Sequence, residues 1–122
     1  SENQSEVLLI KRANEPFKGQ WALPGGFVDK DEPLRNAAAR ELQEETGLRG
    51  ILLTQMHTFG NPGRDPRGHT VSVAYVGYLP LGAKARAGDD AAETEWFRVN
   101  DLPELAFDHI KLVEMAESIF LV

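Results

Sequence analysis

Acidic side chains crowd one short stretch of this chain, residues 25–48, GGFVDKDEPLRNAAARELQEETGL, which glycines bracket. On a helix, Glu41, Glu44 and Glu45 stand at positions i, i+3 and i+4, so they project from one face with Cβ atoms roughly 5–6 Å apart. Carboxylates are hard oxygen ligands, and Mg²⁺ or Mn²⁺ prefers such ligands while retaining several waters. Carboxylates clustered in this way are therefore candidates for a divalent metal site.

The neighbours of the cluster suit a metal-bridged phosphate site. Arg40 can pair with a carboxylate and hold it in one rotamer. The turn Gly25-Gly26 lets the backbone come close to a ligand or to the helix. The alternative is a solvated helix face, since glutamate is a good helix former and exposed like-charge pairs cost only about 0.2–0.5 kcal/mol each.

Composition limits the classes of function. The 122 residues suffice for a single domain, 1–122, with one core, and 42% of them are hydrophobic. We expect no secretory signal and no membrane partner, because the chain has neither a basic, then apolar, N-terminus nor an apolar run of bilayer length. The absence of cysteine excludes disulfides and thiol catalysis and fits a cytoplasmic protein. A formal net charge of −6 gives no attraction to nucleic acid, so an anionic substrate needs a bound cation.

Hydrophobic patterning and turn residues predict strands that alternate with two helices. The predicted strands are residues 6–12, 21–23, 51–60, 70–79 and 94–99. The first helix runs from Pro33 to about Thr46, Gly47 follows its end, and its buried stripe is Leu34, Ala38 and Leu42. The second helix follows the cap residue Asp108, and its inward residues are Ile110, Val113, Ala116 and Phe120. Mixed strands with helices on opposite faces imply an α/β sandwich.

The stretch 25–48 resembles the Nudix box. That pattern is Gly, five residues, Glu, seven residues, Arg-Glu, an aliphatic residue, any residue, Glu-Glu, any residue, Gly and an aliphatic residue. Its positions in this chain are Gly26, Glu32, Arg40, Glu41, Leu42, Glu44, Glu45, Gly47 and Leu48. The resemblance implies a Nudix-type α/β/α sandwich, an α/β (α+β) fold with a mixed sheet and two main helices. Nudix domains usually have a strand before the one at residues 6–12, so we expect either that residues are missing here or that the sheet edge differs.

Nudix enzymes hydrolyse a nucleoside diphosphate linked to another moiety, and the resemblance implies roles for the box residues. The implied metal ligands are Glu41 and Glu45, assisted by Glu44 and Gly26. Arg40 is implied to orient the glutamates, and Glu32 to contribute weakly or through water. The implied cofactor is Mg²⁺, with Mn²⁺ as a substitute, because a divalent ion neutralises phosphate charge and lowers the pKa of bound water.

The residue that activates the attacking water varies within the family. The later acids of this chain that are candidates for this base are Asp89, Asp90, Glu93 and Glu95. We rank Glu93 and Asp90 highest, because the loop before the last strand is placed to swing over the site. The alternative for each of them is a solvated loop acid.

The segment 57–75, HTFGNPGRDPRGHTVSVAY, resembles the ADP-ribose pyrophosphatase branch of the family. A proline that follows the box, here Pro62, and the phrase FGNPGRDPRG carry this likeness. Similar motifs also occur in Nudix-derived transcriptional regulators that sense ADP-ribose. These motifs favour ADP-ribose as the ligand, whereas the box alone does not identify the substrate.

Guanidinium groups supply the remaining substrate-binding candidates. Arg64 and Arg67 are expected to clamp phosphate or ribose hydroxyls through their forked donors, and the alternative is a salt bridge with Asp65. Arg12 joins Gly25 and Gly26 in the predicted substrate-binding set. His109 either lines the pocket or favours the helix start, and the unrelated spacings of the histidines argue against a zinc site.

The leading hypothesis is an Mg²⁺-dependent ADP-ribose pyrophosphatase that releases AMP and ribose 5-phosphate by in-line attack of water. One alternative is another Nudix substrate: an oxidised deoxynucleoside triphosphate, NADH or a dinucleoside polyphosphate. The other is a non-catalytic domain that senses ADP-ribose, and the intact box favours the enzyme over it. The resemblance also implies a homodimer as a possible partnership.

Overall fold

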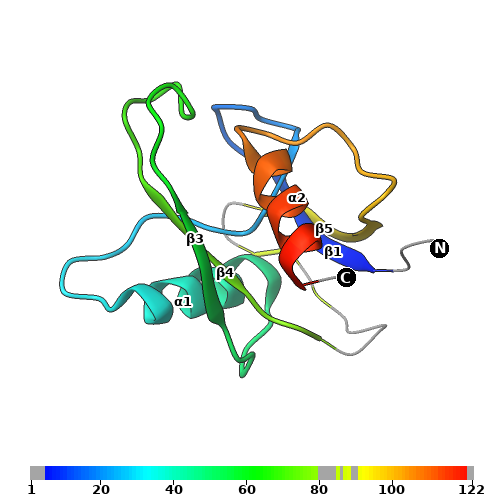
Figure 1. Cartoon of the computed structure of the whole chain (residues 1–122), viewed down its shortest axis with the longest axis horizontal. Coiled ribbons are helices and arrows are strands. Elements are labelled where there is room, and N and C mark those ends of the chain that lie inside the picture. Colours follow the sequence, from blue (N-terminus) through cyan, green and yellow to red (C-terminus); the bar gives the residue numbers. More distant parts are fainter. Residues whose placement is uncertain (1–4, 80–84, 86, 89–90, 121–122) are drawn as a thin grey trace.

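The computed structural model describes residues 5–79, 85, 87–88 and 91–120, whose strands form two antiparallel sheets (Figure 1). In the first sheet the order is β2 (Trp21–Ala22), β1 (Glu6–Arg12) and β5 (Ala91–Arg98). The second pairs β3 (Thr54–Phe59) with β4 (Ser72–Val76). The helices are α1 (Leu34–Thr46) and α2 (His109–Phe120). This architecture confirms the α/β sandwich, although the parallel pairing found among the described residues is a single bridge from Trp21 to Leu105.

The strand β1 lies at the centre of its sheet, as its continuous apolar run predicts. Leu9 is fully buried and Ile10 almost so, and the pairing with β5 extends from Glu6 opposite Arg98 to Arg12 opposite Ala91. This pairing explains why β5 begins at Ala91 rather than at the predicted residue 94, since the partner strand continues that far.

The helix α1 ends as predicted and begins one residue later. Gly47 adopts the left-handed conformation, φ 76°, and its N–H donates to the Gln43 carbonyl at 2.8 Å. Pro33 precedes the helix in an extended conformation, ψ 144°, and its carbonyl accepts the Ala37 N–H at 3.0 Å. Figure 1 shows the β3–β4 ribbon in front of α1, and α2 in front of β1 and β5.

The predicted buried stripe of α1 is wrong in part. Leu34 is 46% exposed, whereas the buried residues of this helix are Ala37, Glu45 and Thr46. The predicted stripe residues instead line a cavity of about 680 Å³, which α1 shares with residues of β1, β4 and α2. The helix therefore presents its apolar face to a cleft and its Glu45 side chain to the interior.

The helix α2 also differs in detail from its predicted pattern. Val113 is buried as expected, but Ile110 is 41% exposed and Leu112 takes a buried position instead. The side chain of Phe120 lies outside the described residues. Asp108 directly precedes the helix, yet both of its carboxylate oxygens accept hydrogen bonds from Arg64 instead of capping the helix.

A small core joins the segments that carry the candidate site. Ile10, Ala22, Ala91 and Ala106 form a buried cluster, against which Phe17 and Phe107 pack. The Ala106 N–H donates to the Trp21 carbonyl at 2.8 Å, so the segment before α2 is attached to β2. Neither described helix has the length and apolarity needed to cross a bilayer.

Candidate active site

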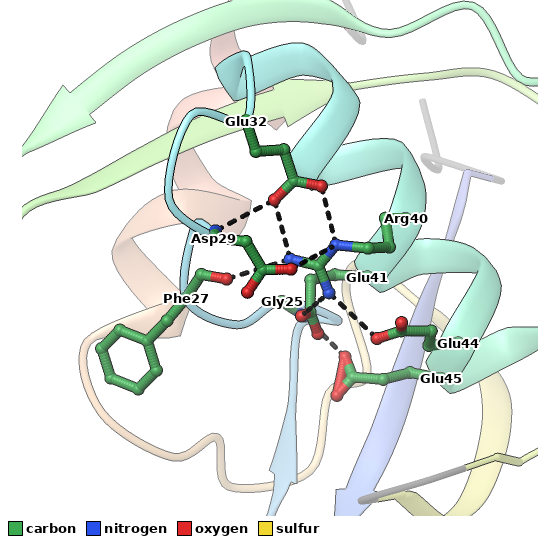
Figure 2. A network of polar contacts seen from close by, with 8 residues as sticks. All are labelled: Gly25, Phe27, Asp29, Glu32, Arg40, Glu41, Glu44 and Glu45. Carbon is green, nitrogen blue, oxygen red and sulfur yellow. Dashed lines mark hydrogen bonds and ion pairs between the residues drawn. The ribbon is translucent and has the colours of Figure 1, made fainter.

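Arg40 stands at the centre of the acidic cluster, as Figure 2 shows. Its Nε and Nη2 donate to the two carboxylate oxygens of Glu32 at 2.8 and 3.0 Å. Its Nη1 donates to Glu41 at 2.6 Å and to Glu44, one helical turn further on, at 3.1 Å. Nη2 also reaches the Phe27 carbonyl at 3.0 Å, which attaches the loop before α1 to the helix.

This pairing favours the charged forms of Arg40 and Glu32. Hydrogen bonds first to Glu32 and then to Glu41 raise the pKa of Arg40 above its ordinary value. The Arg40 hydrogen bond, followed by the backbone N–H of Asp29, lowers the pKa of Glu32. Glu32 therefore binds Arg40 with both oxygens, and the weak or water-mediated metal contact expected of it stays a prediction.

The Gly25-Gly26 turn lies directly against the carboxylates of α1. The Gly25 N–H donates to Glu45 Oε1 at 2.7 Å, and Glu45 is only 6% exposed (Figure 2). A Cβ on Gly26 would lie 2.5 Å from the carboxyl carbon of Glu41, whereas a Cβ on Gly25 would have nothing within 4 Å. The first glycine therefore contributes its N–H, and the second contributes the space for Glu41.

The donor set of this site fits Mg²⁺ or Mn²⁺. Oxygens of Glu41 and Glu44 already converge on one cationic nitrogen, Arg40 Nη1, and a divalent ion prefers the same carboxylate chemistry. Within the described residues no three acidic or histidine side chains stand close enough together to form a metal cage as they lie. Glu41 and Glu44 each bind Arg40 through Oε1, so a metal at these residues would be held through their second oxygens or after a change of rotamer.

Arg64 lines the cavity, but its guanidinium is already engaged. It is 7% exposed, and its Nε and Nη2 each donate to Asp108 at 2.9 Å. Its Nη1 donates to Ser72 Oγ at 2.8 Å and to the Thr70 carbonyl at 3.2 Å. These bonds use most of the donors of a guanidinium and link the β3–β4 loop to the residue before α2, and the phosphate clamp expected of Arg64 stays a prediction.

Arg67 makes the loop salt bridge that was the alternative for it. Its Nε and Nη2 donate to the buried Asp65 at 3.1 and 2.8 Å, and these hydrogen bonds lower the pKa of Asp65. The guanidinium also lies over the rings of Phe27, at 5.2 Å, and Phe107, at 5.5 Å. Arg67 is thus paired with a carboxylate, half-exposed, and in contact with two aromatic rings at the wall of the cavity.

Arg12 differs from the other two arginines because it has no carboxylate partner among the described residues. Its Nε donates to the Pro16 carbonyl at 2.6 Å, and its guanidinium lies 5.0 Å from the centre of the Phe107 ring. The same cavity is lined by Arg12, Gly25, Gly26, Phe27, Glu41, Arg67, Trp96 and Phe107. The cleft is therefore lined both by Arg12, a cation without a carboxylate partner among the described residues, and by Glu41 of the acidic cluster.

A family model described as the NUDIX domain matches residues 1–116. The chain belongs to the NUDIX domain family. Its box glutamates, Arg40 and Gly26 are accordingly brought together in one place on α1 and the adjoining turn.

Individual Nudix proteins resemble the chain over most of its length. It is 47% identical over 113 residues to an ADP-ribose pyrophosphatase of Methanocaldococcus jannaschii, covering 93% of this chain and 66% of that protein. It is 40% identical over 119 residues to the ADPR responsive transcriptional repressor NtrR of Acinetobacter baylyi, covering 94% of this chain and 48% of the repressor. The chain thus spans roughly half to two thirds of the length of these relatives.

The solved structures agree with this membership. The NUDIX domain of Shewanella oneidensis NrtR, complexed with ADP ribose, superposes with a TM-score of 0.85 at 37% identity, covering 97% of this chain and 79% of that one. A MutT/nudix family protein of Enterococcus faecalis gives a TM-score of 0.86 at 34% identity, covering 95% and 55%. Both likenesses confirm the Nudix fold.

The predicted bases of this Nudix domain are not brought to the box glutamates by any contact within the described residues. Glu93 lies on β5 opposite Lys11, whose Nζ is 3.4 Å from its carboxylate. Asp90 and Asp89 lie outside the described residues. Gly88 does reach α1, because its N–H donates to the Glu45 carbonyl at 3.2 Å.

His109 has a contact that sequence reasoning missed. Its Nδ1 accepts the Leu23 N–H at 2.9 Å, and its ring lies 5.4 Å from that of Phe107. Burial lowers the pKa of His109 to about 4, so the ring is neutral at pH 7. Phe107 itself has a positive φ of 54°, an unfavourable conformation of the kind that gathers at functional sites. No periodicity links residues 23 and 109, so no sequence signal pointed to this bond.

Proposed function

We propose that this domain is an Mg²⁺-dependent pyrophosphohydrolase, with Mn²⁺ as a substitute, that cleaves ADP-ribose into AMP and ribose 5-phosphate. The observation that carries the chemistry is the convergence of Glu41 and Glu44 on one cationic point beside the Gly26 turn, with Glu45 next to them. The choice of ADP-ribose is supported by the 47% identity to an ADP-ribose pyrophosphatase and the 37% identity to a domain solved with ADP ribose.

In this proposal Glu41, Glu44 and Glu45 would hold the metal, which would neutralise pyrophosphate charge and lower the pKa of water. The water oxygen bonds to one phosphorus, the bridging P–O bond breaks, and the proton of the water leaves to a base. The departing phosphate keeps the bridging oxygen, so no covalent enzyme intermediate is needed. The identity of the base stays a prediction, and we place Asp90 ahead of Glu93 because Glu93 is paired with Lys11.

The arginines that line the cavity are proposed to contribute differently to substrate binding. Arg12 is proposed to bind a substrate phosphate, because it is the cavity arginine without a carboxylate partner in the described part of the chain. Arg67 and the 64% exposed Phe27 offer flat surfaces on which a base or a ribose can rest. Arg64 is not part of this proposal, since it is bound to Asp108.

A second candidate is ADP-ribose sensing without turnover. It is favoured by the 40% identity to an ADPR responsive transcriptional repressor and by the likeness to the NrtR domain. In this case the cavity and Arg12 would bind the nucleotide, while the carboxylates would hold a metal without hydrolysing the ligand.

The test is a hydrolysis panel with Mg²⁺ that contains ADP-ribose, NADH, a diadenosine polyphosphate and 8-oxo-dGTP, run beside Glu45→Gln. A preference for ADP-ribose that is lost in the variant supports the proposal. Turnover of another member of the panel keeps the chemistry and refutes the ADP-ribose assignment. Calorimetric binding of ADP-ribose without turnover of any member supports the sensor. The homodimer and the cytoplasmic location stay predictions, which gel filtration and cell fractionation test.

A further inference from the structure

We propose that His109 is a positioning residue for the metal site, which fixes the turn at residues 23–26 and through it the carboxylate of Glu45. The inference rests on the proposed function, because it assigns Glu45 to a metal. It concerns a residue of α2 that lies far from the box in the sequence and whose hydrogen bond is to Leu23 rather than to a box glutamate.

The turn has two backbone N–H groups that bind side chains of two different helices, α2 and α1. The Leu23 N–H donates to His109 Nδ1 at 2.9 Å, and the Gly25 N–H donates to Glu45 Oε1 at 2.7 Å. Pro24, between them, has no N–H and a fixed φ, so the two donors are joined by a stiff residue. A displacement at Leu23 is therefore passed on to Gly25 and Gly26.

The acceptor at His109 is itself held in place. A ring nitrogen that accepts an N–H carries no proton, so His109 is neutral with its proton on Nε2. Its neighbour Asp108 is fastened by two hydrogen bonds of 2.9 Å from Arg64, and the Phe107 ring lies 5.4 Å from the imidazole. The start of α2 is thus a rigid support from which Nδ1 points at the turn.

The position of this turn affects the positions of two glutamates. Glu45 is 6% exposed and accepts the Gly25 N–H, so a shift of the turn removes one of its contacts. Gly26 lies so close to Glu41 that even a Cβ would meet its carboxylate oxygens. If the turn moves, both proposed ligands change their positions, although His109 touches neither of them by hydrogen bond.

The experiment measures Mn²⁺ affinity of the full chain without substrate, from the electron paramagnetic resonance signal of free Mn²⁺. Three variants are compared with the wild type: His109→Asn, His109→Gln and His109→Phe. Asparagine can place its Oδ1 near the position of Nδ1 and accept the Leu23 N–H, whereas glutamine carries the same amide one methylene further out and phenylalanine has no acceptor. We expect about a 10-fold or greater loss of affinity for Phe and Gln, and less than about 3-fold for Asn.

The outcomes separate this inference from the proposed function. Wild-type affinity in His109→Phe overturns the inference, and so does an equal loss in His109→Asn and His109→Gln. If His109→Phe does not fold by circular dichroism, the Asn and Gln pair decides. If the wild type binds no Mn²⁺, the proposed metal function fails. Hydrogen exchange at the Gly25 amide then tests whether His109 holds the turn in place. Faster exchange in His109→Gln than in His109→Asn supports the positioning of the turn by His109, and equal exchange overturns it.

Discussion

Arg40 and Glu32 face each other across two parallel hydrogen bonds, from Nε to Oε2 at 2.8 Å and from Nη2 to Oε1 at 3.0 Å. A paired fork of this kind fixes the plane of the guanidinium as well as its position. The remaining nitrogen, Nη1, is thereby directed at Glu41 and Glu44. Glu32 thus orients the residue that orients the proposed metal ligands.

This relationship predicts that Arg40→Lys weakens Mn²⁺ binding about 10- to 100-fold, the usual effect of removing a partner that orients a metal ligand. An ammonium keeps the charge but lacks the fork, so it cannot hold Glu32 and direct the box glutamates together. Titration with Mn²⁺ measures the effect, and Arg35→Lys, at an exposed position of the same helix, is the control. Equal affinities in the two variants would show that orientation by Arg40 is unimportant.

The glycines of the turn predict opposite results for the same substitution. In Gly26→Ala the new Cβ meets the Glu41 carboxylate, so we expect kcat/KM for ADP-ribose to fall about 100-fold, as for a ligand displaced by about 1 Å. In Gly25→Ala the Cβ has nothing within 4 Å and the N–H to Glu45 is retained, so activity changes little. The proposed arrangement is refuted if Gly25→Ala is the more damaging of the two.

Arg12→Gln is expected to raise the KM for ADP-ribose about 10-fold while kcat changes less, because a charged hydrogen bond to the bound phosphate is lost. Steady-state kinetics measure both constants, with Arg35→Gln as the control. An unchanged KM would remove Arg12 from the substrate site.

The pair of Arg64 and Asp108 predicts a loss of stability. Their side chains are 7% and 16% exposed, so Arg64→Gln leaves a nearly buried carboxylate without its cation and lowers the free energy of unfolding by about 3–5 kcal/mol. Urea denaturation checks this value. Lys11→Gln breaks the exposed pair with Glu93 and serves as the matched control, with an expected loss below about 1 kcal/mol. Similar losses in both variants would contradict the structural role given to Arg64.

Mild acid should destabilise the fold through His109. Its pKa is about 4 in the folded chain against 6.5 ordinarily, so between these values the unfolded chain binds a proton that the folded chain does not. Stability is therefore full above pH 6.5 and falls by at most about 3 kcal/mol as the pH approaches 4. Glu32, whose folded pKa is lowered from 4.5, adds its own loss only below that pH.

Urea denaturation of the wild type and His109→Asn between pH 7 and pH 5 tests this expectation. The variant has no imidazole to titrate, so its stability should depend less on pH in that window. If the free energy of unfolding changes equally with pH in both proteins, His109 is not the group responsible for the pH dependence.

Local patterns predicted those features that depend on neighbouring residues. The box helix ends at Gly47 because only a residue that tolerates φ 76° closes the helix in this way. The central place of β1 follows from a continuous apolar run. The i, i+4 spacing brings Arg40 to Glu44, as helical geometry requires.

Contacts between distant segments were not predictable in this way. Arg64 meets Asp108 across 44 residues and Leu23 meets His109 across 86, and no periodicity relates such positions. The same limit explains the error at Leu34, where a helical stripe identified an apolar face but not whether another element covers it. Arg12 and Arg64 are equivalent as sequence letters, and only the fold shows which of them has a carboxylate partner.

The ion pairs of Arg40 have a consequence for the order of assembly. A cluster of carboxylates normally resists folding in the absence of metal, but here the Arg40 guanidinium offsets part of the charge through its ion pairs with Glu32, Glu41 and Glu44. We expect the domain to be folded before any ion arrives and to remain folded in a chelator, unlike zinc-dependent domains that unfold without metal. Metal loading would then be a reversible addition to a site that Arg40 already orders, governed by the supply of ions rather than by the folding of the chain.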